Sequence, residues 1–231
     1  MNKLVLPLVL VLLFIVSACT PRLFRGMDRE ARQTIKRSQL YPFNYTRGET
    51  ETYSMQLNYK DNVINCILLV EPEENGNIRG VCTSVFGSTV LDFYLTEKGM
   101  FIYDCMEQLK HKKLLRLLEK DLMTTFFKRF DQASYEAKVW SLRHKSPSAI
   151  ATEPLVLSKG YSLKGKMGKC HIKTDEIEQH VVEIENSGKL SAANIRFDYA
   201  QGNQSPQTVS INHPNLGLSI LIEKYETETS N

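Results

Sequence analysis

Apolar residues recur every three or four positions across residues 106–130, the longest stretch of the chain with a helical period. This spacing places them on one side of an amphipathic helix. The apolar stripe consists of Leu115, Leu118, Leu122, Phe126 and Phe130, and Leu114, Met123 and Phe127 widen it. The opposite side carries Lys112, Lys113, Arg116, Lys120, Thr124 and Lys128. We expect this helix to pack on a sheet rather than to lie free on a membrane surface, because the pattern is that of a core-facing helix.

Strand patterns fill the chain on both sides of this helix. Before it, apolar and polar positions alternate from Thr50 onward, and turn residues divide residues 50–103 into about five strands, including one at 63–70 and one at 78–86. After it, we expect a short strand at 139–142, a loop at 143–152 and further strands across residues 182–222.

A second, shorter helix is expected near the start of the folded region. Asp28 can cap a helix that runs to about Gln39, with Ala31, Ile35 and Leu40 facing inward. An antiparallel sheet with one apolar face has to cover that face, and these two helices are available to do so. The predicted fold class is therefore α+β, a curved and mostly antiparallel sheet with helices covering its concave face.

The N-terminus carries a secretory signal in residues 1–18. Lys3 precedes an apolar run at 4–16, which is shorter than the roughly 20 residues of a transmembrane helix. The following Val16-Ser17-Ala18-Cys19 resembles the bacterial lipobox. That resemblance implies a diacylglyceryl group on the Cys19 thiol, cleavage after Ala18 and acylation of the new amine. The alternative is an ordinary secreted protein cut near Ala18, with Cys19 as a free thiol.

The resemblance also implies a domain organisation and a cellular location. Residues 19–27 would form a short lipidated tether with Pro21 and Gly26, and residues 28–231 a single domain. Thr20 stands where an aspartate favours inner-membrane retention in enteric lipoproteins. We therefore expect a palmitate-bearing lipoprotein in the outer membrane that faces the periplasm, with surface display as a minor alternative.

The net charge argues against a nucleic-acid partner, and the cysteine spacing argues against a zinc site. The formal net charge of +3 is no signature of nucleic-acid binding. Four cysteines remain besides Cys19, namely Cys66, Cys82, Cys105 and Cys170, and their spacing fits no zinc site. Cys66 and Cys82 lie on strands that flank the turn at Asn75-Gly76, so a hairpin would bring them nearly opposite and allow a disulfide. The alternative is that both are small buried hydrophobes.

Catalytic chemistry is not indicated. Residues 160–166 fit the first seven positions of a phosphate loop, but Met167 stands where the magnesium-binding hydroxyl belongs. The lysines of this segment suggest either a basic loop that touches lipid head groups or a solvated loop. The five histidines are scattered, and neither a nucleophile elbow nor a metal spacing is present in the sequence. We expect no enzyme activity, no cofactor and no metal.

The order of helix, strand meander, helix and second meander resembles the LolA/LolB-like half-barrels, which are carriers and receptors of lipoprotein localisation. The resembling residues are Gly76-Asn77-Ile78-Arg79-Gly80, Ser84-Val85-Phe86-Gly87, Pro206-Gln207-Thr208-Val209 and residues 218–222. The resemblance implies a concave apolar cavity, lidded by helices, that holds acyl chains. Its candidate lining residues are Leu115, Leu118, Leu122 and Phe126.

Two functions remain open. The protein is either a carrier or receptor for acylated or hydrophobic cargo, or a structural or assembly lipoprotein of the envelope that binds protein partners and has a solid core. Core residues and cavity-lining residues share one sequence pattern. The sequence therefore does not separate the two.

Overall fold

The computed structural model describes residues 21–36, 40–43, 45, 48–127, 134–144, 155–165, 168–175, 180–186, 192–201, 203 and 205–225. Within these ranges only the backbone is described at 134, 143–144, 155–157, 164–165 and 168.

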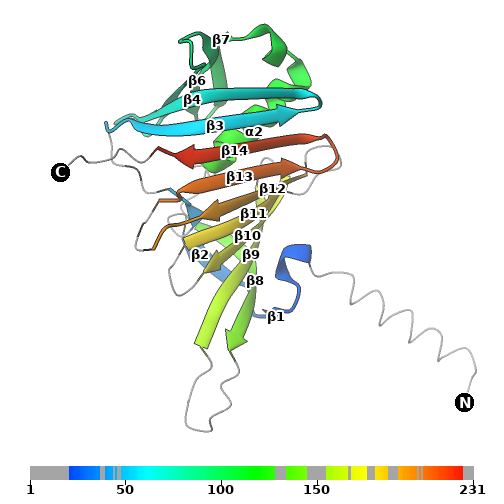
Figure 1. Ribbon diagram of the computed structural model, residues 1–231. Coiled ribbons are helices and arrows are strands. Elements are labelled where there is room, and N and C mark those ends of the chain that lie inside the picture. Colours follow the sequence, from blue (N-terminus) through cyan, green and yellow to red (C-terminus); the bar gives the residue numbers. More distant parts are fainter. Residues whose placement is uncertain are drawn as a thin grey trace, which may run out of the picture.

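In the described residues, fourteen strands form one antiparallel, unclosed sheet (Figure 1). The order across the sheet is β1-β8-β9-β10-β11-β12-β13-β14-β3-β4-β5-β6-β7, and β2 also pairs with β8. The strands are β1 (Asp28–Arg29), β2 (Gln33–Lys36), β3 (Glu51–Tyr59), β4 (Asn62–Pro72), β5 (Ile78–Thr83), β6 (Thr89–Thr96), β7 (Gly99–Cys105), β8 (Ser134–His144), β9 (Leu155–Gly165), β10 (Gly168–Asp175), β11 (His180–Asn186), β12 (Ala193–Asp198), β13 (Thr208–His213) and β14 (Leu218–Lys224). Strand β14 pairs with β3 and so joins the two meanders into one curved surface.

Alternation of apolar and polar residues explains why the sheet has an inner and an outer face. Along β3, Tyr53, Met55 and Leu57 are buried, and the residues between them are partly exposed. The same alternation places Val209, Ile211 and His213 of β13 inside. Strands β3 to β7 confirm the five strands expected before the helix, and β13 and β14 confirm the last two. The predicted curved antiparallel sheet is confirmed.

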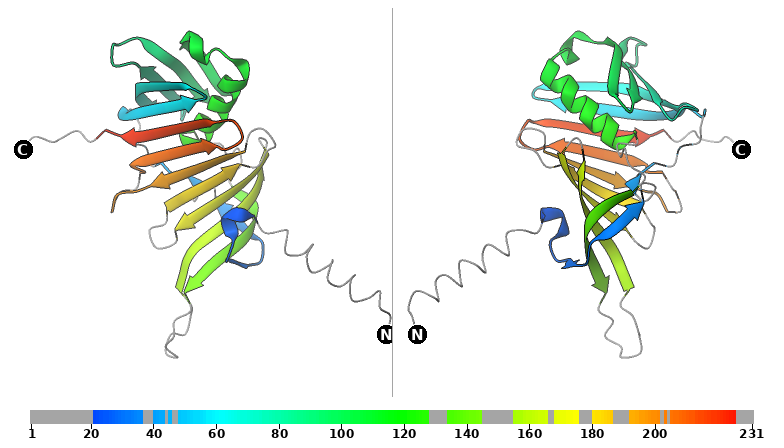
Figure 2. Two further views of the ribbon diagram at one scale, coloured as in Figure 1. Left: turned by 45° about the vertical axis from the view of Figure 1, so that its right-hand side comes forward. Right: turned by 180° about the vertical axis from the view of Figure 1, so that it is seen from behind.

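A single α-helix, α2 (Lys112–Thr125), lies on the concave face within the described part of the chain (Figure 2). It is shorter than the predicted 106–130, because the chain first forms the 3-10 turn η3 (Glu107–Leu109) and the helix ends at Phe126. The side of the helix that was predicted to be polar and exposed is exposed only in part. Arg116 is exposed, but Lys120 and Thr124 are buried, since every residue from Lys120 to Phe127 is enclosed by the curved sheet and its connections.

The helix expected at residues 28–39 is wrong. The chain there forms the strands β1 and β2, both paired with β8, and residues 37–39 lie outside the described ranges. Without this pairing β8 would be an edge strand with unsatisfied N–H and C=O groups, and such an edge is costly and prone to association. Ile35 and Leu40 are buried as expected, but Ala31 is exposed.

The core is one continuous apolar cluster between the concave face and α2. The ring of the fully buried Phe93 packs directly against the backbone at Gly80, where a Cβ atom would overlap it. At the β7 edge, Met100 N donates to Glu119 Oε1 of the helix at 3.2 Å, which satisfies one edge donor. Within the described residues no helix is long and apolar enough to cross a membrane.

Candidate functional site

The residues predicted to line a cavity belong to α2 and to its C-cap, Phe126. Leu118 and Leu122 are each 1% exposed and Phe126 is 4% exposed. Leu115 is only half-buried and packs at the margin of the core cluster. The structure thus brings three of the four residues together in the core and leaves Leu115 at its rim.

Aromatic rings surround the C-terminal end of α2. The Phe126 ring centroid lies 5.2 Å from that of Phe43 and 5.9 Å from that of Tyr53. Phe43 stacks on Tyr45 at 5.2 Å and meets Phe197 edge-on at 6.4 Å. Burial raises the pKa of Tyr45 well above its ordinary value, so its phenol stays neutral. The result is an apolar wall that joins the helix to β3 and β12.

A buried hydrogen-bonding contact joins α2 to the sheet. His213 Nε2 of β13 lies 2.7 Å from Asp121 Oδ2 of α2, and both side chains are fully buried. Sequence reasoning missed both residues, although a signal was present. Asp121 falls three residues after Leu118 on the apolar stripe, and His213 continues the inward alternation of Val209 and Ile211. A polar group at an inward position is the informative exception to the pattern.

The β5–β6 turn displays two apolar side chains to solvent. Val85 is 74% exposed and Phe86 is 94% exposed. The turn is held by Ser84 and Ser88, whose hydroxyl oxygens lie 2.8 Å apart, while Ser88 N donates to Ser84 Oγ at 3.2 Å. These residues belong to a segment that carried the family resemblance. Burial of apolar surface in the core therefore does not explain Phe86.

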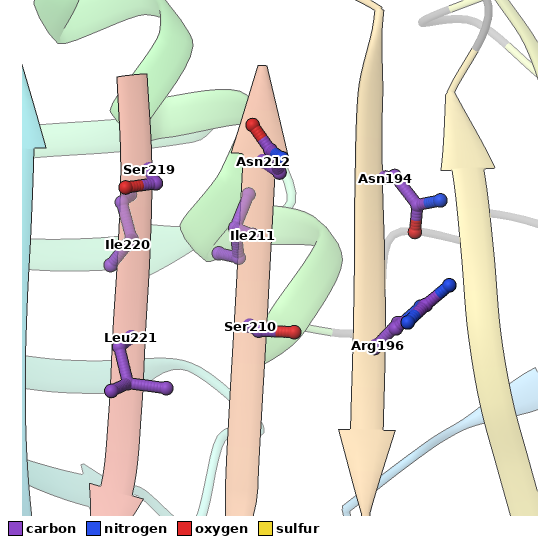
Figure 3. A pocket seen from close by; sticks show the side chains of 8 residues that line it. All are labelled: Asn194, Arg196, Ser210, Ile211, Asn212, Ser219, Ile220 and Leu221. Atoms are coloured by element: carbon purple, nitrogen blue, oxygen red, sulfur yellow. The ribbon is translucent and has the colours of Figure 1, made fainter. Parts of the chain in front are cut away.

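The outer face carries a pocket of different character (Figure 3). Its volume is about 380 Å³, and it is lined by Asn194, Arg196, Ser210, Ile211, Asn212, Ser219, Ile220 and Leu221. Asn194 Nδ2 donates to Glu183 Oε1 at 2.7 Å, and Arg196 Nε lies 3.7 Å from the same oxygen. The lining mixes amide, hydroxyl and guanidinium groups with the apolar Ile211, Ile220 and Leu221. This mixed lining differs from the apolar cavity that the family resemblance implies, so the acyl-binding hypothesis is placed on the concave face.

The phosphate-loop-like segment is not a loop before a helix. Residues 160–165 belong to β9, and β10 follows after residues 166–167, which lie outside the described ranges. Gly160 pairs with Trp140 on one side and with Lys173 on the other. The loop expected here is therefore wrong, because the described residues on both sides of 166–167 form paired strands. In the described ranges no three His, Cys, Asp or Glu residues lie close enough together to hold a metal ion.

Cys66 and Cys82 lie close together as free, buried thiols. Cys82 pairs directly with Leu68, so Cys66 is its diagonal neighbour rather than its opposite partner. A hydrogen bond between the thiols lowers the pKa of Cys66 and, together with burial, raises the pKa of Cys82. Diagonal neighbours have Cα atoms about 7 to 8 Å apart, more than a disulfide spans without backbone movement. The disulfide remains a prediction.

Comparison with known proteins identifies the fold. No family model matches the chain, and no curated protein is similar to it. Among solved structures, a LolA superfamily protein from Nitrosomonas europaea superposes with a TM-score of 0.54 at 10% identity, covering 83% of this chain and 92% of that one.

Two further structures are less similar. An outer membrane lipoprotein-sorting protein domain from Vibrio parahaemolyticus has a TM-score of 0.45 at 14% identity, covering 84% of this chain and 90% of that one. A DUF1329 family protein from Desulfovibrio piger has a TM-score of 0.43 at 8% identity, with the same two coverages of 84% and 90%. The predicted resemblance to LolA/LolB-like half-barrels is confirmed at the level of the fold.

Proposed function

We propose that this protein is a lipid-anchored lipoprotein of the cell envelope that binds acyl chains, of lipids or of lipoprotein cargo, between α2 and the concave face. The observation that carries this proposal is the position of the helix. The C-terminal half of α2 is enclosed by a curved, unclosed sheet and presents Leu118, Leu122, Met123 and Phe126 to it.

The side chains beneath the helix suit a variable apolar ligand. Leu, Met and Phe fill irregular space, and methionine in particular adapts to different partners. Movement of α2 away from the sheet would expose this surface, and an acyl chain would then replace the contacts of the helix. The His213–Asp121 contact holds the helix in the closed position.

The exposed β5–β6 turn supports an interaction with lipid. Phe86 at 94% exposure is suited to meet the acyl chains of a cargo. The lipobox-like sequence at Cys19 supplies the proposed anchor, since two or more acyl chains give stable attachment. The sorting residue Thr20 favours the outer membrane.

A structural or assembly role is the second candidate. The observation that favours it is the tight burial of the stripe, since Leu114, Leu118 and Leu122 are each no more than 2% exposed. A solid core of this kind needs no ligand. Envelope protein partners would then bind elsewhere on the surface.

Titration with a fluorescent fatty acid separates the two functions. For a carrier, we expect saturable binding by the purified protein, a weaker affinity in Leu118→Phe and a nearly unchanged free energy of unfolding. Leu69→Phe is the matched control, because Leu69 is 38% exposed on the outer face of β4. No binding by the wild type, together with a loss of about 1 to 3 kcal/mol of stability in Leu118→Phe through overpacking, would favour the solid core.

A further inference from the structure

The segment that follows Cys19 is docked on the outer face of the sheet. The 3-10 turn η1 (Arg22–Phe24) ends in Phe24, which is fully buried although it lies outside the core cluster. Its ring centroid lies 4.6 Å from that of Trp140 on β8 and 5.5 Å, edge-on, from that of His171 on β10. Figure 2 shows η1 against this end of the sheet.

The socket for Phe24 is built into three neighbouring strands. Trp140 pairs with Gly160, and His171 pairs with Ser162, two residues further along β9, so all of them lie on one face. Their sequence neighbours Val139, Tyr161 and Ile172 point into the core on the other face. Gly160 is needed because a Cβ atom there would overlap the Phe24 ring.

Backbone hydrogen bonds shape the segment on both sides of Phe24 and then join the chain to the sheet. Phe24 N donates to Pro21 O at 3.0 Å, and Met27 N donates to Phe24 O at 3.1 Å. Glu30 N then donates to Val139 O of β8 at 2.9 Å. Residues 21–27, part of the segment 19–27 expected as a tether, are therefore fixed to the sheet at Phe24.

We propose that this docked segment holds the outer face of β8–β10 against a membrane surface and that its basic side chains contact anionic phospholipid head groups. The inference rests on the proposed acylation of Cys19. Cys19 precedes Pro21 by two residues, which span about 7 Å at most. An acylated Cys19 therefore keeps the bilayer surface next to the Phe24 socket.

The charge of this region fits anionic head groups. Residues 21–36 contain five cationic side chains and two carboxylates, a net charge of +3 that equals that of the whole chain. Arg22 and Arg25 flank Phe24 and are exposed, as are Lys138 and Lys169 on the adjoining strands, beside the carboxylate of Glu136. Each cation held near an anionic bilayer strengthens binding by about fivefold.

The chain contains its own reporter for this orientation, because Trp140 is its single tryptophan. The acylated protein is reconstituted into phosphatidylcholine vesicles, with or without phosphatidylglycerol, that carry a dansyl group on phosphatidylethanolamine. Energy transfer from Trp140 to dansyl then measures how close the socket lies to the head groups. The control is Trp140→Phe, which keeps an aromatic ring beside Phe24, combined with Tyr103→Trp, since Tyr103 is 66% exposed on β7 at the far end of the sheet (Figure 1).

We expect severalfold greater transfer from Trp140 than from the tryptophan of the control, and a further gain when phosphatidylglycerol is present. Phe24→Ala should release the segment and lower the transfer, while Arg22→Glu with Arg25→Glu should abolish the gain from phosphatidylglycerol. Thermal unfolding shows that each variant is folded.

The outcomes separate this inference from the proposed function. Protein that floats with the vesicles but transfers equally from both tryptophans has its anchor and overturns only the orientation. Transfer that is high but indifferent to phosphatidylglycerol overturns the role of the basic residues. Protein that does not float with the vesicles overturns the acyl anchor and with it this inference.

Discussion

At the residue scale, His171 makes stability depend on pH. Burial, followed by the charge of Lys169, lowers the pKa of His171 from 6.5 to about 4. Between these values the unfolded chain binds a proton that the folded chain does not, so the free energy of unfolding falls as the pH decreases. The loss is up to about 3 kcal/mol and is complete near pH 4.

Urea unfolding of the wild type and of His171→Gln at several pH values tests this dependence. The difference between the two proteins isolates His171 from other titrating groups. We expect the stability of the wild type to fall relative to the variant between about pH 6.5 and pH 4. Parallel curves across this range would contradict a buried, neutral His171.

The His213–Asp121 contact is the second feature at this scale. Replacing His213 takes one hydrogen-bond partner from the buried Asp121 carboxyl, and the loss of a buried hydrogen bond costs about 1 to 3 kcal/mol. We therefore expect His213→Ala to lose stability of that order in urea unfolding. His111→Ala is the matched control, since His111 is exposed and its side chain makes no capping hydrogen bond. A loss below about 1 kcal/mol in His213→Ala would mean that this contact does not hold the helix.

At the scale of elements, local patterns predicted the strands well and one helix poorly. The strand expected from Thr50 is β3, and the one expected at 63–70 is β4, because alternation and turn residues are local signals. The segment 28–39 has a candidate helix cap at Asp28 and inward apolar spacing, yet its described residues pair with β8, about a hundred residues away. Such a pairing satisfies a distant strand edge, which no local pattern reveals.

The ends of α2 illustrate the same limit. Lys120 and Thr124 fall on the side expected to face water, but the helix enters the concave face and both are buried. Thr124 Oγ1 is accommodated by donating to Lys120 O at 2.7 Å within the helix. The sequence predicts one buried side of the helix, but the curved sheet buries residues on its other side as well.

The β5–β6 turn gives a prediction at the scale of elements. Phe86→Ser should change the free energy of unfolding by less than about 0.5 kcal/mol, because Phe86 is 94% exposed. The same variant should transfer a bound fluorescent fatty acid to vesicles more slowly than the wild type, if Phe86 contacts the acyl chain as it leaves the protein. Thr89→Ser, at the start of β6, is the control for the substitution of a nearby residue. Equal transfer rates for wild type and Phe86→Ser would mean that the β5–β6 turn takes no part in fatty-acid transfer.

At the scale of the molecule, the fold class and the LolA-like half-barrel could be predicted because the number and spacing of strands determine a long antiparallel sheet. The docking of Phe24 could not. It depends on Trp140, Gly160 and His171 meeting on one face, and these residues are separated from Phe24 by more than a hundred positions. The pocket on the outer face likewise gathers side chains from three strands.

The last prediction concerns the proposed lipid anchor at Cys19. Cys19→Ser should abolish labelling by radioactive palmitate and release the protein from membranes, because a serine at this position cannot form the thioether to a diacylglyceryl group. Cys105→Ser is the control, since Cys105 is buried in the fold and should leave labelling intact. Thr20→Asp should leave labelling intact as well but shift an enteric host's protein from the outer to the inner membrane fraction. Incorporation of no label by the wild type would mean that the chain is secreted without an anchor, and the sheet face at Phe24 would then have no bilayer beside it.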